Sequence, residues 1–222
     1  MPRYRLTLVL LILLTPKLYA EKPRKPAPPQ PASTYVSNET LERDTIAAEP
    51  GDTKETRPNT RLDYFSHGMM PMRVIVTNDT DKPVTLDDAR INLITASDAV
   101  IHAATLDDLQ RRMFTIKGST GSKVPLPLPI PIPITTGKKN VDKKILDDDN
   151  DFGFQTTTVP PHATVAGYLY YDMQDLDSST PDSFLKDATL ELRKVRFASS
   201  SDYIDSYEIP LRPTAKDAAV KP

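Results

Sequence analysis

The sequence predicts an all-β protein, an antiparallel β-sandwich with one or two short helical insertions. Three observations lead to this fold class. Short runs in which apolar and polar residues alternate recur between about residues 61 and 212. Turn-rich stretches separate several of these runs, as is typical of antiparallel sheets. The 222 residues include 22 prolines, only 7 glycines and no cysteine, so the fold must depend on a packed core without disulfides.

The predicted strands follow the alternation along the chain. The first is a run of apolar residues that ends at the turn signal Asn78-Asp79-Thr80-Asp81. In order, the predicted strands cover residues 72–77, 82–86, 91–96, 100–103, 152–159, 165–171, 190–195 and 203–209. Strands of this length that alternate between faces can share one buried interior, which is the arrangement of a sandwich.

Two intervals interrupt the strands with helical character. Thr105 is a suitable N-cap for a helix over residues 106–114, with acidic residues in the first turn and arginines near the end. A second candidate covers residues 138–146, although its lysines lie toward the N-terminal end, where the helix dipole disfavours them. These two intervals are the predicted helical insertions.

The first twenty residues have the pattern of a secretory signal peptide. Arg3 and Arg5 precede an apolar run over residues 6–14, and the segment ends on the small residue Ala20. The apolar run is shorter than the roughly 17–25 residues of a membrane-spanning helix. We therefore expect cleavage near Ala20 and delivery to the periplasm or the medium. There are two alternatives for this segment. It could be retained as an uncleaved anchor, which would be the chain's one contact with a membrane, or it could be a buried N-terminal helix.

Residues 21–60 predict a proline-rich, disordered linker. Prolines and charged residues dominate this stretch, and its one aromatic residue is Tyr35, so it offers little surface to bury. The linker would act as a spacer for a single domain over residues 61–212, or have no role of its own. Residues 213–222 form a second polar tail.

The run from Lys123 to Ile134 alternates proline with leucine or isoleucine. As polyproline II it would be a rod without one apolar face. As a strand it would place all its prolines on one face and could pair through one edge alone, which prevents further strand addition. Its apolar positions are our candidate partner-binding residues, namely Leu126, Leu128, Ile130 and Ile132.

Composition excludes several classes of function. The net charge is −2, and it falls to −5 once residues 1–20 are removed, so the broad basic field of a nucleic-acid-binding protein is absent. Without cysteine there is no thiolate metal site and no cysteine nucleophile. His67, His102 and His162 match no local metal motif, and Ser66 beside His67 predicts no catalytic pair because neighbouring side chains diverge on an extended chain. We expect no cofactor, no metal and no enzymatic activity.

The acidic run at residues 147–151 raises the possibility of calcium. Asp147, Asp149 and Asp151 are the candidate ligands, but residues 152 and 158 lack the glycine and glutamate of an EF-hand loop. The alternative is a solvated acidic turn ahead of the strand predicted at Phe152. We favour the turn.

Two stretches resemble exported bacterial immunoglobulin-like domains of uncharacterised role. Residues 72–86, MRVIVTNDTDKPVTL, look like their early strand–turn–strand. Residues 159–172, VPPHATVAGYLYYD, are similar to their pattern Pro-Gly-x-x-x-x-Gly-x-Leu-x-Phe, with His162 in place of the first glycine. The resemblance implies an immunoglobulin-like sandwich and carries no catalytic residue.

Taken together, these observations predict a non-enzymatic binding or structural module of the cell envelope. Its partner would be a protein of the envelope that is captured through sheet edges or loops, for example by strand addition. The main alternative is a metal-dependent hydrolase or a calcium-binding domain on the same sandwich. A spacer without a specific ligand is a third hypothesis.

Overall fold

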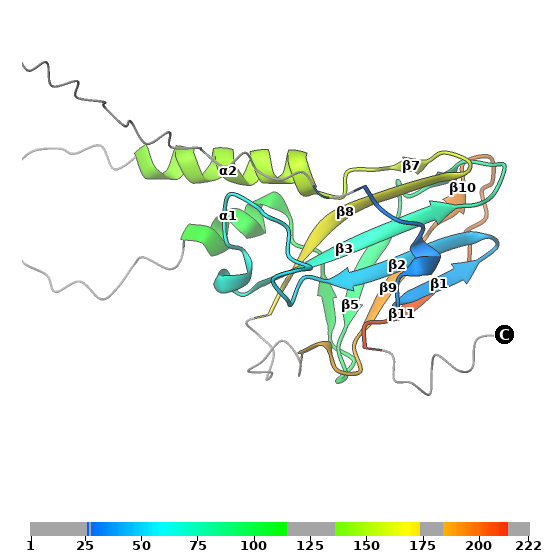
Figure 1. Cartoon of the computed structure of the whole chain (residues 1–222), viewed down its shortest axis with the longest axis horizontal. Helices are drawn as coiled ribbons and strands as arrows, with labels where there is room; N and C mark the ends of the chain where they lie inside the picture. The colour runs from blue at the N-terminus through cyan, green and yellow to red at the C-terminus, as the bar shows by residue number, and fades with distance from the viewer. Residues whose placement is uncertain (1–25, 27, 115–135, 174–183, 213–222) are drawn as a thin grey trace, which may run out of the picture.

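A computed structural model describes residues 26, 28–114, 136–173 and 184–212 (Figure 1). It confirms the predicted fold class, because three antiparallel sheets dominate the described chain and two helices are inserted between strands. The elements are η1 (Ala32–Thr34), β1 (Asn38–Leu41), β2 (Asp44–Pro50), η2 (Phe65–His67), β3 (Met69–Asn78), β4 (Val84–Thr85), β5 (Arg90–Ile94), β6 (Val100–His102), α1 (Leu106–Phe114), α2 (Thr136–Phe152), β7 (Thr158–Val159), β8 (Ala163–Asp172), β9 (Thr189–Arg193), β10 (Arg196–Phe197) and β11 (Tyr207–Pro210).

Two four-stranded sheets form the sandwich. The first has the order β1-β2-β3-β8, and we call it the N-terminal sheet; the second has the order β11-β9-β5-β6, and we call it the C-terminal sheet. A small third sheet, β10-β4-β7, lies toward one end. The longest pairing joins β3 to β8 over ten residues, from Met69 opposite Asp172 to Asn78 opposite Ala163. This register determines which side chains share each face of the N-terminal sheet.

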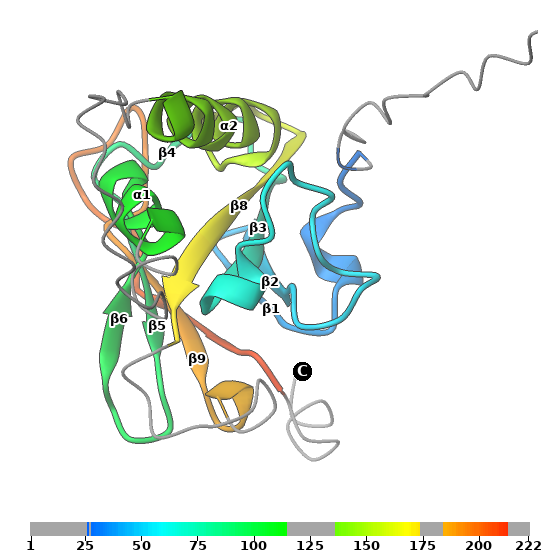
Figure 2. The ribbon, with the colours of Figure 1, turned by 90° about the vertical axis from the view of Figure 1, so that its left-hand side faces the viewer.

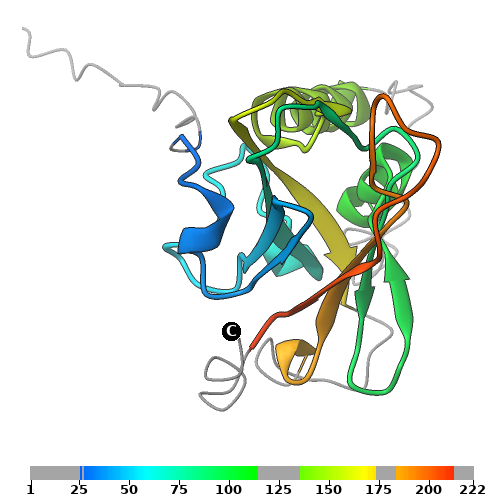
Figure 3. The same ribbon diagram turned by 90° about the vertical axis from the view of Figure 1, so that its right-hand side faces the viewer.

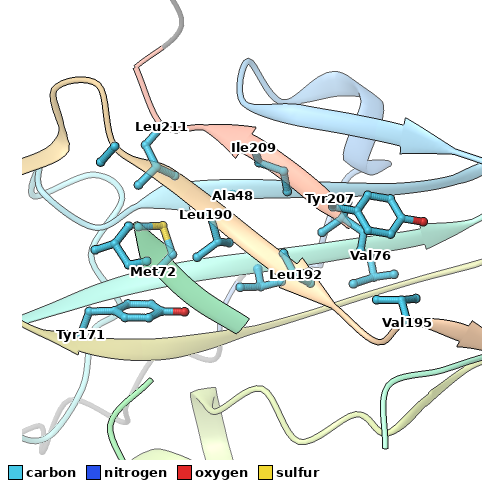
Figure 4. Close-up of a cluster of buried hydrophobic side chains, with 14 of the residues drawn as sticks. Ala48, Met72, Val76, Tyr171, Leu190, Leu192, Val195, Tyr207, Ile209 and Leu211 are labelled. Atoms are coloured by element: carbon cyan, nitrogen blue, oxygen red, sulfur yellow. The ribbon is translucent and has the colours of Figure 1, made fainter. Parts of the chain in front are cut away.

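The core lies between the two large sheets, as Figure 4 shows. Alternate residues of β3 point into it, and alternate residues of β9 and of β11 point back from the other sheet. The central members are almost completely buried: Met72, Val74, Val76, Tyr171, Leu190, Leu192, Tyr207 and Ile209. Burial of these residues on both layers is the main stabilising contribution to the fold.

The first predicted helix is confirmed by α1. Its start is fixed by a capping box in which the Asp108 amide donates to Thr105 Oγ1 at 3.3 Å and Asp108 Oδ2 accepts from the Thr105 amide at 2.9 Å. The second helix, α2, extends further than the predicted residues 138–146 and lies beside α1 near β8 (Figure 2). No helix in the described ranges is long and apolar enough to cross a membrane.

Seven of the eight predicted strands overlap a strand of three or more residues or the two-residue β4, and the prediction at 165–171 lies entirely within β8. The strand predicted over 152–159 is wrong at its start, because Phe152 ends α2, Gly153 makes an isolated bridge to Tyr168, and strand β7 begins only at Thr158. The alternation of Phe152 and Phe154 reflects packing on two different clusters, with Phe152 beneath the helices and Phe154 against the main core.

The linker predicted over residues 21–60 is wrong for residues 38–50. These residues form β1 and β2, and β2 pairs with β3 over seven positions, from Asp44 opposite Asn78 to Pro50 opposite Met72. A two-residue turn joins the strands, with Glu42 and Arg43 both at positive φ. The apolar stretch over residues 46–48 is fully buried, so the domain begins well before residue 61.

Three predictions concern segments outside the described residues. They are the signal peptide over residues 1–20, the proline-alternating run with Leu126, Leu128, Ile130 and Ile132, and the tail over residues 213–222.

Candidate functional site

The outer face of the N-terminal sheet is covered at two places. At one, residues of η1 and the segment after it pack on the sheet in a small cluster made of Ala32, Tyr35, Ala47, Ile75 and Ala166. At the other, α1, α2 and the segment before η2 cover it in a second cluster, made of Tyr64, Met69, Leu109, Ile145, Phe152, Tyr168 and Tyr170. The polar row between these covers is the floor of the candidate site.

Three residues in register form that floor. Glu49 of β2 lies opposite Arg73 of β3, and Arg73 lies opposite Tyr168 of β8. Above them is a cavity of about 740 Å³, which we call the sheet-face cleft. Its lining is mainly polar and charged: Pro26, Glu49, Lys54, Glu55, Thr56, Arg57, Pro58, Asn59, Asp63, Arg73, Phe152 and Tyr168. The volume lies within the range of small-molecule and peptide pockets.

The loop over residues 51–63 forms one wall of the cleft, and Arg57 holds it in place. Arg57 Nε donates to the Gly51 carbonyl at 3.1 Å, and Nη2 donates to the Asp52 carbonyl at 2.8 Å. The guanidinium carbon also lies 3.4 Å from the centre of the Phe65 ring, a cation–π contact. A side chain at Gly51 would approach Pro71 Cγ to 2.6 Å, so the loop starts in close contact with β3.

The floor carries both signs of charge. Arg73 Nη1 lies 3.6 Å from Glu49 Oε2, and the two side chains are 12% and 30% exposed. Tyr168 donates its hydroxyl hydrogen to the Thr56 carbonyl at 3.2 Å, which ties the loop to β8. Burial raises the pKa of Tyr168, so the phenol is neutral and acts as a hydrogen-bonding group. The cleft is therefore suited to a polar ligand that offers donors and acceptors.

The cleft lining contains no histidine, cysteine or serine among the described residues. The sequence did not point to Arg73, because only the pairing register places it beside Tyr168. The loop residues were hidden by their position within the predicted linker.

The candidate calcium ligands lie on α2, and the acidic turn that we favoured is wrong. Asp147 and Asp151 are one helical turn apart and both approach Arg61, whose nitrogens lie 3.9 Å and 2.6 Å from their carboxylates. Asp149 instead accepts a hydrogen bond from the Gln155 amide at 3.0 Å. The three carboxylates do not converge, and no metal-binding group of His, Asp or Glu occurs in the part of the chain that the structure describes.

Asp148, which the sequence analysis did not single out, is the buried member of the acidic run. It is 1% exposed and accepts hydrogen bonds from the Arg61 amide at 2.9 Å, from Arg61 Nη1 at 3.0 Å and from the Tyr64 hydroxyl at 3.2 Å. Burial and the Asp148 charge raise the pKa of Tyr64. This set of contacts anchors α2 over the sheet and so positions Phe152 at the cleft.

The three histidines lie apart. His67 Nδ1 is 3.1 Å from Ser66 Oγ, so the expectation that these neighbours diverge is wrong, because η2 is a 3₁₀ turn. The same nitrogen is 2.7 Å from the Asp63 carbonyl, to which it donates, so it is not free to act as a base for Ser66. His102 contacts Asn92, and His162 contacts an exposed aspartate.

The sheet edges differ in accessibility. On the outer edge of β8, the Ala104 amide donates to the Tyr170 carbonyl and the Phe154 amide donates to the Tyr168 carbonyl. On the opposite side of the sandwich, β1 and β11 are neighbours. The edge of β6 is short and carries the exposed Val100, which is 53% exposed. Among the described strands, β6 is therefore the edge on which strand addition is least obstructed.

Comparison with known proteins identifies no family for this chain. No protein-family model and no curated protein matches it. One solved structure that it resembles is the crystal structure of a functionally unknown protein from Listeria monocytogenes EGD-e, with 18% identity over 80% of this chain and 84% of that chain. The TM-score is 0.35, a similarity too low to assign a fold or a function.

Proposed function

We propose that this protein is an exported, non-enzymatic binding module of the cell envelope that holds a polar segment of a protein partner in the sheet-face cleft. Export is supported by the pattern of residues 1–20, and it agrees with the resemblance to exported immunoglobulin-like domains. The resting place would be the periplasm or the medium.

One observation carries the proposal. The polar row formed by Glu49, Arg73 and Tyr168 lines the cleft between two covered regions of the same sheet face, with Tyr168 itself buried and Glu49 the most exposed of the three. Its groups are presented by a rigid sheet, and Arg57 holds the loop above it by hydrogen bonds to the Gly51 and Asp52 carbonyls, so the binding surface is preorganised. Paired charges of both signs suit a peptide, whose backbone offers donors and acceptors together.

Site-specific photo-crosslinking in the native envelope tests the proposal. A photoreactive residue is introduced into the full-length chain at Lys54 or at Asn59, which are exposed at the cleft. The matched control is Lys186, which is also exposed but precedes β9 in the other sheet. We expect a discrete crosslinked partner from the two cleft positions and none from the control.

The outcomes separate the hypotheses. A further probe replaces Val100 on β6; a crosslink from that position with none from the cleft would move the partner site to the β6 edge and refute the cleft assignment. Crosslinks at no position would support a spacer without a specific ligand. Stoichiometric calcium or zinc in the purified protein would replace the proposal by the alternative, a calcium-binding domain or a metal-dependent hydrolase.

A further inference from the structure

The start of β2 contains a completely buried carboxylate. Asp44 is 0% exposed, and its Oδ2 accepts a hydrogen bond from the Tyr207 hydroxyl at 2.9 Å. No donor among the described residues reaches its Oδ1. A buried carboxylate oxygen without a partner is unusual in native proteins and calls for a physical explanation.

The hydrogen bond from Tyr207 joins the two layers of the sandwich. Asp44 belongs to the N-terminal sheet and Tyr207 to β11 of the C-terminal sheet. Along the same side, Ser37 Oγ donates to the Leu211 carbonyl at 3.3 Å, and the Glu208 amide donates to the Glu39 carboxylate. Figure 3 shows the blue β1–β2 hairpin and the orange-red β11 on these two layers. We call this set of contacts the hairpin seam.

The charges around Asp44 disfavour its ionised form. Asp79, beyond the end of β3, acts on Asp44, whereas Glu39 of β1 and Glu42 of the β1–β2 turn act on its partner Tyr207, whose pKa they raise. Arg43 of the turn is exposed. Burial raises the pKa of Asp44 to about 7, with a further increase from Asp79 and an opposing decrease from the Tyr207 hydrogen bond.

We propose that Asp44 is a protonation-dependent latch that holds the β1–β2 hairpin against β11 when it is protonated and releases the hairpin when it ionises. The protonated carboxyl is neutral, so its burial costs little free energy. The ionised carboxylate is poorly solvated in the closed seam, so ionisation favours the open seam, in which water solvates the charge. The hairpin is at the sheet edge and β1 has only four residues, so opening it exposes less surface than global unfolding does.

The sign of the pH effect follows from the two states. In the closed seam Asp44 titrates near 7, whereas in the open, hydrated seam it titrates near its ordinary value of 3.8. The closed form therefore loses stability as pH rises between these values, and the loss stops growing above the higher one. Linkage between the two values predicts an opening constant roughly 100-fold larger at about pH 8.5 than at about pH 5.

The test combines a titration with hydrogen exchange on the full-length protein. Carbon NMR of the Asp44 side chain should show a midpoint near 7. Amide protection in β1, β2 and β11 should fall with pH, by up to roughly 100-fold after correction for intrinsic exchange. The β5–β9 pair serves as the internal reference. Asp44→Asn should abolish the pH response, and Glu42→Gln in the exposed turn should keep it.

Two results would overturn the latch. An Asp44 midpoint near the ordinary aspartate value would show that the buried carboxylate is accommodated without strain. If amide protection fell equally with pH in the seam and in the β5–β9 reference, the pH effect would be a global loss of stability and not a local opening. Both measurements use the wild-type chain, so neither depends on the folding of a variant.

Discussion

Replacement of Asp148 by alanine should loosen α2 from the N-terminal sheet. The substitution removes the acceptor of three hydrogen bonds, two from Arg61 and one from Tyr64. Breaking a fully buried charge pair costs about 3–5 kcal/mol because one partner is left uncompensated. Here Arg61 is 26% exposed and keeps Asp151 at 2.6 Å, so we expect a smaller loss than for a fully buried pair, about 2–3 kcal/mol.

The matched control is Asp147→Ala on the same helix. Asp147 is 41% exposed and lies 3.9 Å from Arg61, so its removal should change the free energy of unfolding by no more than about 0.5 kcal/mol. Urea unfolding followed by far-UV circular dichroism measures both variants. For a domain of this size, the Asp148 loss corresponds to a decrease in Tm of roughly 8 °C.

Equal destabilisation by the two substitutions would refute this reasoning. It would mean that the buried position and hydrogen bonds of Asp148 contribute no more than an exposed ion pair does. A large effect of Asp148→Ala alone would identify the carboxylate as the anchor of α2.

Three further predictions concern local features of the fold. Gly167→Ala should lower the free energy of unfolding by about 3 kcal/mol in urea titration, because its Cβ would overlap the Phe154 backbone; a near-neutral result would contradict that close approach. Thr105→Ala should cost about 1 kcal/mol at neutral pH through the lost cap. Its hydrogen bonds lower the pKa of Asp108, so this loss should shrink as pH falls through that pKa, and a pH-independent loss would argue against the cap. Calcium should leave Tm unchanged in a thermal melt, because Arg61 already faces the acidic run of α2, and a clear rise would contradict this.

The strands and the first helix were predictable because their signals are local. The alternation in β3 and β8 reports which side of a pleated chain faces the core, and no distant residue is needed to read it. The α1 helix was located with the same bounds, since the cap at Thr105 and the charges of the first and last turns lie within the helix itself. The absence of cysteine likewise determined that no disulfide joins the layers.

The cleft could not be predicted, because its floor exists only after three strands have paired. Arg73 has a charged residue on one side and a tyrosine on the other through the register of β2, β3 and β8, and no spacing along the chain encodes that register. The β1–β2 hairpin was missed for a related reason. Its composition resembles a linker, and it is stabilised by pairing with β3 and by burial of residues 46–48 beneath β11 and η1.

The sequence by itself therefore determined the class of fold, the strand and helix signals and the absence of cysteine chemistry. Tertiary structure alone decided where the domain begins, that the acidic run continues a helix, and that Asp44 is buried against Tyr207. The physical reason is the separation along the chain over which each interaction acts. Alternation and capping act within a few residues, whereas sheet pairing, charge compensation by Arg61 and desolvation of a carboxylate depend on segments brought together only by folding.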